Sequence, residues 1–220
     1  TALSRGDERT GRQRRPRGGR LQPAHPHGDR RWRAAHVEGD DACPHCAELR
    51  AVHRGVTAPE WPQTGLVLPW LFTAGKGSPS LLYELRRELA ACDQVDILVS
   101  FITVSGVRKL QDVLQQITAR GGDGTVGTRL RILTTTYTGA TEARALDELA
   151  RLPGCEVRVS LDGRRTRLHA KAWLFHRRSG FGSAYVGSAN SSGAALTGGL
   201  EWTVKLTQRA QQALFDRAAA

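Results

Sequence analysis

The sequence predicts an α/β fold with a mixed, largely parallel β-sheet flanked by helices and preceded by a disordered basic tail. Two observations support this prediction. After residue 65, short apolar runs of strand length alternate with amphipathic stretches of about ten to fifteen residues. Before residue 57, Arg, Gly, Pro and His dominate, and neither the helical nor the strand period persists.

The chain is expected to divide into three segments. Residues 1–60 are a basic low-complexity tail or linker, 61–208 are the folded domain, and 209–220 begin a C-terminal helix that belongs to a longer chain. The absence of methionine, even at position 1, indicates a fragment or a coding region read from an internal start.

Composition limits the class of protein. No window reaches the roughly 18 consecutive apolar residues of a membrane span, and the arginine-rich start lacks the apolar stretch of a signal peptide. We therefore expect a soluble, cytoplasmic protein that makes no membrane contact. The net charge of +11 favours a nucleic-acid partner, although a GC-rich genome raises the arginine content of its proteins, and so their charge, without any ligand.

Local patterns give the expected order of elements. Ser80 caps a helix that runs to about residue 91, and Ser105 caps a second helix. Strands are expected at 95–101, 129–134, 155–161, 167–176, 183–187 and 200–206, with further helices at 141–152 and 191–196. The polar loop 177–182 suits a hairpin between two of these strands.

The segment 167–176 carries the first candidate site residues. If it is a strand, alternation places His169, Lys171, Trp173 and Phe175 on one face, with Leu168 and its alternating neighbours on the other. The imidazole and the ammonium then lie roughly 6–7 Å apart, which suits one tetrahedral phosphate. A single His-x-Lys arises easily by chance.

A second polar group follows the next predicted strand. Gly187 permits close backbone approach, while Ser188, Asn190 and the start of the following helix can donate hydrogen bonds to an anion. Glu201 opens the last predicted strand, where its carboxylate could accept the second ring N–H of His169 and fix its tautomer.

His169-Ala170-Lys171, Gly187-Ser188-Ala189-Asn190 and Glu201 together resemble the signature of the phospholipase D (PLD) superfamily, most closely its nuclease branch. Over residues 66–206 the chain also resembles the PLD-like domain in front of bacterial DEAD/DEAH-type superfamily 2 helicases. The resemblance implies a PLD-like sheet, phosphodiester hydrolysis of DNA or RNA, and a helicase domain on the same or a neighbouring chain.

The resemblance also implies a role for each site residue. His169 attacks phosphorus to form a phosphohistidine, Lys171 and Asn190 hold the phosphoryl oxygens with help from Ser188, and Glu201 orients His169. Water then releases the phosphate. Neither a metal nor a cofactor is implied.

Two departures from the family pattern are present. His176 stands where the full signature has Asp, which weakens a phospholipid hydrolase or transferase more than a nuclease. The chain has one HxK half-site, whereas the family uses two. Either a homodimer joins two half-sites across a two-fold axis, or the site is incomplete and the protein is a non-catalytic phosphate-binding module.

Other residues allow two interpretations each. Arg164, Arg165 and Arg167 contact a nucleic-acid backbone or belong to a solvated turn. Trp173 and Phe175 stack on bases or, more simply, pack in the core. The threonine-rich end of the strand near 134–138 borders the site or is an ordinary β-branched strand end.

The cysteines give no clear site. Cys43 and Cys46 could hold zinc with a histidine such as His45, or form a redox pair, but their surroundings favour neither. Cys92 and Cys155 are expected to be reduced structural residues.

Overall fold

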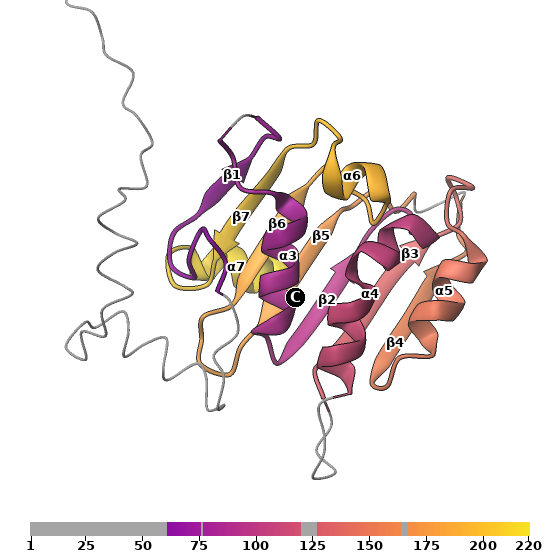
Figure 1. The fold of residues 1–220 in the computed structure, drawn as a ribbon, viewed down its shortest axis with the longest axis horizontal. Coiled ribbons are helices and arrows are strands. Elements are labelled where there is room, and N and C mark those ends of the chain that lie inside the picture. The colour runs from indigo at the N-terminus through magenta and orange to yellow at the C-terminus, as the bar shows by residue number, and fades with distance from the viewer. Residues whose placement is uncertain (1–60, 76, 120–126, 164–166) are drawn as a thin grey trace, which may run out of the picture. The chain divides into compact units, whose positions relative to one another are not determined.

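The computed structural model describes residues 61–75, 77–119, 127–163 and 167–220, in which seven strands form one sheet (Figure 1). The strand order is β1-β7-β6-β5-β2-β3-β4. The elements, in chain order, are β1 (Trp70–Phe72), α3 (Leu81–Ala90), β2 (Gln94–Leu98), α4 (Val104–Thr118), β3 (Arg129–Thr135), α5 (Ala143–Ala150), β4 (Cys155–Ser160), β5 (Ala172–His176), β6 (Ser183–Gly187), α6 (Gly193–Thr197), β7 (Thr203–Thr207) and α7 (Gln212–Ala219).

The α/β class and the mixed sheet are confirmed, but the expectation of a largely parallel sheet is wrong. Among the named strands of the sheet, only β2, β3 and β4 pair in parallel, and α4 and α5 provide the crossovers that parallel neighbours need. The pairings β2–β5, β5–β6, β6–β7 and β7–β1 are antiparallel. The connection between β5 and β6 is a short loop, which cannot cross the sheet and therefore produces the expected hairpin.

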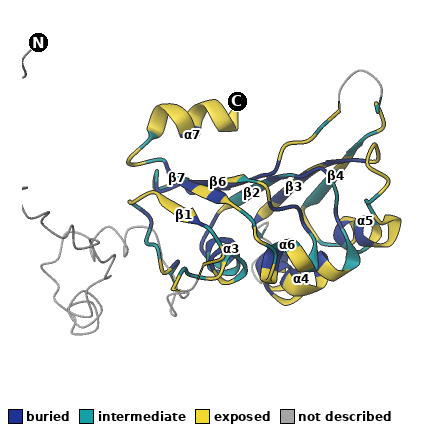
Figure 2. Ribbon diagram, turned by 90° about the horizontal axis from the view of Figure 1, so that it is seen from above, coloured by how far each residue is buried: buried dark blue, intermediate teal, exposed yellow. Residues whose placement is uncertain are grey.

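Helices cover the two faces of the sheet unequally. Helices α3, α4, α5 and α6 lie on one face and α7 lies on the other, as Figure 2 shows. The main core lies under the first layer, where Val95 and Ile97 of β2 meet Leu110 and Leu114 of α4. Phe215 of α7 packs in a smaller cluster with Ala172, Leu174 and Ala184.

The two aromatic residues of β5 for which base stacking and core packing were both considered belong to the main core. Trp173 and Phe175 are buried, and their rings lie 6.3 Å apart in a stacked arrangement. Phe175 also contacts Tyr185 edge to face, with ring centroids 5.6 Å apart. The packing interpretation is therefore confirmed, and neither ring is available to a nucleobase.

The capping of two helices differs from expectation. Helix α4 is capped by Thr103, whose hydroxyl accepts a hydrogen bond from the Gly106 amide, and Ser105 lies inside the first turn. Ser80 is the N-cap of α3, but its side chain makes no capping hydrogen bond. The expectation that Ser105 caps α4 is therefore wrong: threonine is also a favoured N-cap residue, and the helix begins one residue after Thr103.

Strand β5 begins at Ala172 rather than at residue 167. Its neighbour β2 ends at Leu98, which is paired with Ala172, so the preceding residues have no β2 partner. The expected alternation of His169 and Lys171 within a strand is therefore wrong. Similarly, β7 begins at Thr203, and the predicted strand residues 200–202 precede it.

A buried ionic cluster joins α3 to the antiparallel half of the sheet. The Glu88 carboxylate is fully buried and accepts hydrogen bonds from Arg177 Nη2 and from Tyr185 Oη, the latter at 2.9 Å. Lys205 Nζ of β7 lies 2.9 Å from Glu88 Oε1. Burial alone raises the pKa of Glu88, but Lys205 and Arg177 outweigh it and lower this pKa to about 2.

Among the described residues, no helix is both long and apolar enough to cross a membrane. The predicted tail at 1–60, including Cys43 and Cys46, lies outside the described residues. Cys92 is buried and Cys155 is half-buried, and both are free thiols.

We expect Glu88→Gln to lower the free energy of unfolding by about 3–5 kcal/mol, because it leaves Arg177 and Lys205 buried without a counter-charge. The measurement is denaturant unfolding near pH 7. Asp112→Asn is the matched control: it removes an ion pair with Arg86 in which the Asp112 side chain is 69% exposed, and should cost about 0–1 kcal/mol.

The same carboxylate predicts a pH dependence. Because the pKa of Glu88 falls from the ordinary 4.5 to about 2 in the folded protein, its contribution is complete above pH 4.5 and is lost as pH falls toward 2. The loss of stability over that window should therefore be smaller in Glu88→Gln. An identical slope in both proteins would contradict this role.

Candidate active site

Three segments that carry the predicted site residues meet at one end of the sheet. His169 and Lys171 precede β5, Ser188 and Asn190 follow β6, and Glu201 precedes β7. Because β5–β6 and β6–β7 are antiparallel, the start of β5, the end of β6 and the start of β7 lie at the same end. The end of β2 lies there as well, since Leu98 is paired with Ala172.

His169 and Lys171 are in direct contact. Lys171 Nζ lies 2.9 Å from His169 Nδ1 and 3.0 Å from Nε2, and it donates to the His169 carbonyl oxygen at 2.9 Å. This contact is much closer than the strand geometry predicted. An ammonium can only donate, so the ring nitrogen that receives it must carry a lone pair. The pair thus places an imidazole in direct contact with a cation, and the lone pair that accepts from Lys171 must leave that hydrogen bond before it can act as a nucleophile.

The two side chains differ in exposure. His169 is exposed, whereas Lys171 is buried. Burial lowers the pKa of the Lys171 ammonium, and the nearby carboxylate of Glu201 partly opposes that effect. A reagent can therefore reach the imidazole from solvent while the ammonium is held behind it in a less polar setting, where its attraction for an anion is stronger.

Asn190 is held in one orientation by the backbone after β2. Its Oδ1 accepts hydrogen bonds from the amides of Ser100 at 3.1 Å and Phe101 at 3.3 Å. With Oδ1 occupied, the Nδ2 group is the part of the amide that can serve a ligand, and it can only donate. Asn190 is therefore arranged as a donor to an anion. Sequence reasoning missed the contribution of residues 100–101, which are about 90 positions away.

Ser188 and Glu201 form a second pair. The Ser188 hydroxyl donates to Glu201 Oε2 and accepts from the Trp202 amide at 3.1 Å. The expected hydrogen bond between Glu201 and His169 is not among those of the described residues. Glu201 instead acts on the site through Ser188 and through its charge on Lys171.

Gly187 permits the close approach of β6 and β7 next to this pair. A Cβ atom on Gly187 would lie 2.1 Å from the Trp202 carbonyl oxygen and 2.7 Å from the Thr203 Cα. Both are backbone atoms, so a side chain at this position would push the strands apart. The glycine expected from the motif is required here by space.

Other predicted residues lie away from this end or outside the described ranges. His176, at the position of the family's Asp, is at the far end of β5, where its Nε2 lies 2.8 Å from Asp96 Oδ2. Arg164 and Arg165 lie outside the described residues, and Arg167 is exposed. Thr135 donates to the Ser160 carbonyl oxygen, so the threonine-rich strand end has a structural partner.

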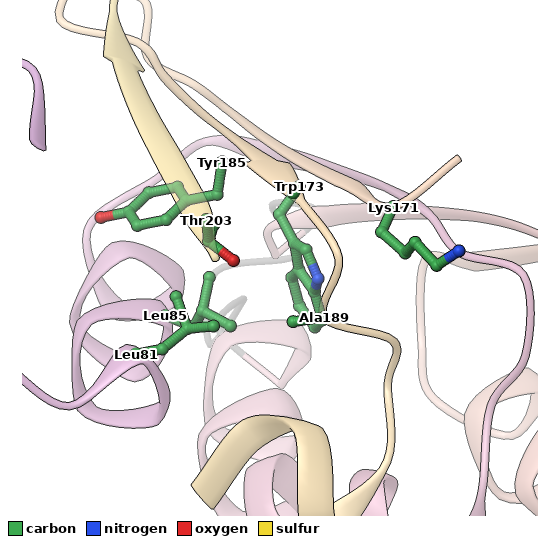
Figure 3. Close-up of a pocket in the computed structure, with 8 residues that line it drawn as sticks. Leu81, Leu85, Lys171, Trp173, Tyr185, Ala189 and Thr203 are labelled. Atoms are coloured by element: carbon green, nitrogen blue, oxygen red, sulfur yellow. The ribbon is translucent and has the colours of Figure 1, made fainter. Parts of the chain in front are cut away.

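A small cavity lies behind Lys171, between α3 and the sheet (Figure 3). It is lined by Leu81, Leu85, Trp173, Tyr185 and Thr203, among others, and has about 10 Å³ of water-accessible space, which is enough for one water. Figure 3 shows the Lys171 ammonium pointing away from these side chains. The cavity is too small for a nucleotide, so a substrate must approach from the exposed side of His169.

The chain resembles known proteins in its structure. No protein-family model matches the chain, and no curated protein matches it significantly. Among solved structures, NucT from Helicobacter pylori, a member of the PLD superfamily, superposes with a TM-score of 0.52 at 16% identity, covering 69% of this chain and 92% of NucT.

Two further structures match less well. Polyphosphate kinase from Porphyromonas gingivalis has a TM-score of 0.41 at 12% identity, covering 73% of this chain and 26% of the kinase. A mutant of yeast tyrosyl-DNA phosphodiesterase 1 has a TM-score of 0.35 at 11% identity, covering 52% of this chain and 25% of that protein. These two superpositions are too weak to support a conclusion. The match to NucT shows that the chain has a PLD-like fold, as the motifs implied.

The space around Gly187 yields a prediction. Gly187→Ala should lower the free energy of unfolding by about 1–3 kcal/mol through overpacking, because the new methyl group meets the backbone of β7. Gly198→Ala is the control: a Cβ there meets nothing within 4 Å, so the change should stay within about 0.5 kcal/mol. Thermal unfolding measures both, and equal effects would contradict the steric argument.

Proposed function

We propose that this chain is a PLD-like phosphodiesterase, namely a metal-independent nuclease domain that cleaves DNA or RNA through a phosphohistidine intermediate. The observation that carries the proposal is the contact between the exposed His169 imidazole and the buried Lys171 ammonium, at the same end of the sheet as the donor amide of Asn190. This arrangement offers a nucleophile, a cation and a neutral donor on a PLD-like fold, which are the groups that attack at phosphorus requires.

The proposed first step forms one bond and breaks another. A lone pair of the His169 ring attacks phosphorus, a P–N bond forms, and the P–O bond to the departing nucleotide breaks. Lys171 and the Asn190 Nδ2 group hold the non-bridging oxygens, whose negative charge increases during attack. Ser188 and Glu201 position each other through their hydrogen bond, and the Glu201 charge acts on Lys171. Water then attacks phosphorus and releases His169.

The departing oxygen needs a proton, and the half-site formed by one chain holds one histidine of the HxK motif. We propose that a homodimer supplies the second group: His169 of the partner subunit gives its proton to the departing oxygen and then takes up the proton of the attacking water. A two-fold axis brings identical half-sites together, because each residue then faces its own copy. The sequence resemblance alone supports association with a helicase domain on the same or a neighbouring chain.

A non-catalytic phosphate-binding module is the second candidate function. It is favoured by the hydrogen bond that Ser188 donates to Glu201, because the described residues then show no hydrogen bond from His169 to this carboxylate that would orient the ring. Such a module would still bind nucleic acid, and its affinity would fall steeply with added salt.

His169→Ala should reduce cleavage of labelled DNA or RNA by more than about 10³-fold, because the nucleophile is lost while the exposed position tolerates alanine. Cleavage is measured in EDTA, together with detection of an acid-labile phosphohistidine at residue 169 of the wild-type chain. His176→Gln, which keeps a partner for Asp96 at the far end of β5, is the control and should cleave normally. Cleavage that survives His169→Ala would refute the mechanism, and salt-sensitive binding without cleavage would favour the binding module.

A mixing experiment tests the shared site. When wild-type and His169→Ala chains are co-refolded in equal amounts, random pairing leaves about one quarter of dimers with two histidines, so about a quarter of the activity should remain. Independent monomers would retain about half. Sedimentation of the same mixture establishes whether dimers are present, and half-activity would argue that one chain forms a complete site.

A further inference from the structure

A large aromatic side chain is exposed immediately beside the candidate site. Trp202 is 64% exposed, although its ring is one of the largest apolar groups that a protein can bury. Leu200, on the other side of Glu201, is 88% exposed. Two large apolar side chains therefore flank a residue of the site in the solvent, and neither contributes to the cores described above.

The backbone of Trp202 is fixed with respect to the site. Its amide donates to the Ser188 hydroxyl at 3.1 Å, and its carbonyl oxygen accepts from the Ser188 amide at 3.0 Å. The missing side chain of Gly187 lets this carbonyl approach closely. The indole thus projects from a backbone position that is tied to Ser188, and only its two side-chain torsions remain to be ordered by a ligand.

Exposure alternates along this segment. Thr203 and Lys205 are buried, whereas Trp202 and Val204 are exposed, so the indole leaves the chain on the side opposite the buried pair. Lys205 reaches Glu88 of α3, which places the buried side toward the helical layer. The indole therefore lies on the face that α3 does not cover, whereas Lys171 lines the cavity on the α3 side, so a ligand that touches both must pass across the end of the sheet.

We propose that Trp202 stacks on a nucleobase adjacent to the phosphate held by Lys171 and Asn190, and so selects substrates with an unstacked base. This inference rests on the proposed function. Every base offers a flat π-face that an indole can cover, whichever base it is. In a duplex both faces of each base are already covered by neighbours, so the same contact favours single strands.

The charge of the chain supports a nucleic acid over a lipid surface as the ligand. The net charge is +11, and Arg167 is exposed two residues before His169. A polyanion with bases satisfies the cationic groups and the indole together. On the same face of the sheet, Val186 and Leu71 pair with Val204 and are more than 40% exposed, so Trp202 stands at the end of a short apolar stretch of sheet surface.

The test compares two single-stranded ligands of equal length and charge: a thymidine homopolymer and a backbone of abasic residues. In EDTA, Trp202→Ala should raise KM for the homopolymer by about 5- to 150-fold, with kcat little changed, because stacking aids binding. Trp202→Phe should recover most of the loss, since a smaller ring still stacks. The abasic ligand should be cleaved equally by wild type and Trp202→Ala.

Val204→Thr is the matched control, because Val204 is 41% exposed on the same face and the change preserves a β-branched side chain. It should leave both ligands unaffected. Equal losses on both ligands would mean that Trp202 has only a structural role. If Val204→Thr raises KM as Trp202→Ala does and both variants change the sedimentation of the protein, this face binds a second copy of the chain. Binding to vesicles of anionic phospholipid is measured as well, and an effect of Trp202→Ala on vesicles alone would identify a lipid contact. Each of these results overturns the proposal.

Binding of the same two ligands is measured in parallel in the His169→Ala background. If the wild-type chain cleaves neither DNA nor RNA, the proposed enzymatic function fails. The binding comparison still tests Trp202 separately, because a stacking contact requires the base and does not require chemistry. Equal affinity for the homopolymer with and without the indole would then overturn the inference.

Discussion

The carboxylate of Glu88 joins parts of the chain that are distant in sequence. Arg177 from the turn after β5, Tyr185 of β6 and Lys205 of β7 all converge on it, and Arg177 also donates to the Ala91 carbonyl oxygen at the end of α3. Unpaired charges would be costly at this depth, so the three strands can take only a register that satisfies all the partners. That register sets which residues stand at the ends of β5, β6 and β7.

The candidate site follows from that register. Ala172 faces Val186, and Gly187 faces Thr203, so the segments just beyond these pairs are forced together. The absence of a Cβ at Gly187 lets the Trp202 carbonyl approach, and the Ser188 hydroxyl then lies between Glu201 and the Trp202 amide. Positioning by backbone atoms is suited to a site whose task is to hold charge at fixed points, because little reorganisation is needed when the charge develops.

The candidate site contains both buried and exposed groups. Lys171 is buried while its partner His169 is exposed, and Asn190 has its acceptor atom occupied by the backbone. The proposed attack uses the exposed group, and the proposed binding of oxygens uses the groups held behind it. One chain provides a single HxK motif, so the proposed cleavage depends on a second half-site, which assembly rather than the fold of one chain would supply.

Sequence reasoning identified the motif residues that the structure brings to one end of the sheet, together with most helices and strands. It was wrong where a local pattern allowed two outcomes. Ser105 was expected to cap α4, but Thr103, two residues earlier, is the residue whose hydroxyl accepts from the Gly106 amide. The segment before Ala172 has strand-like alternation, yet β2 ends at Leu98 and provides no further partner.

By itself, the sequence determined the α/β class, the hairpin of β5 and β6 and the identity of the motif residues, because periodicity, turn chemistry and short motifs act over a few neighbouring positions. Only the tertiary structure decided that four of the six strand pairings are antiparallel, that Asn190 is held by the Ser100 amide, and that Glu201 meets Ser188. These features depend on contacts between residues far apart in the chain. Their geometry is set by strand register and by the pairing of buried polar groups, which no local pattern encodes.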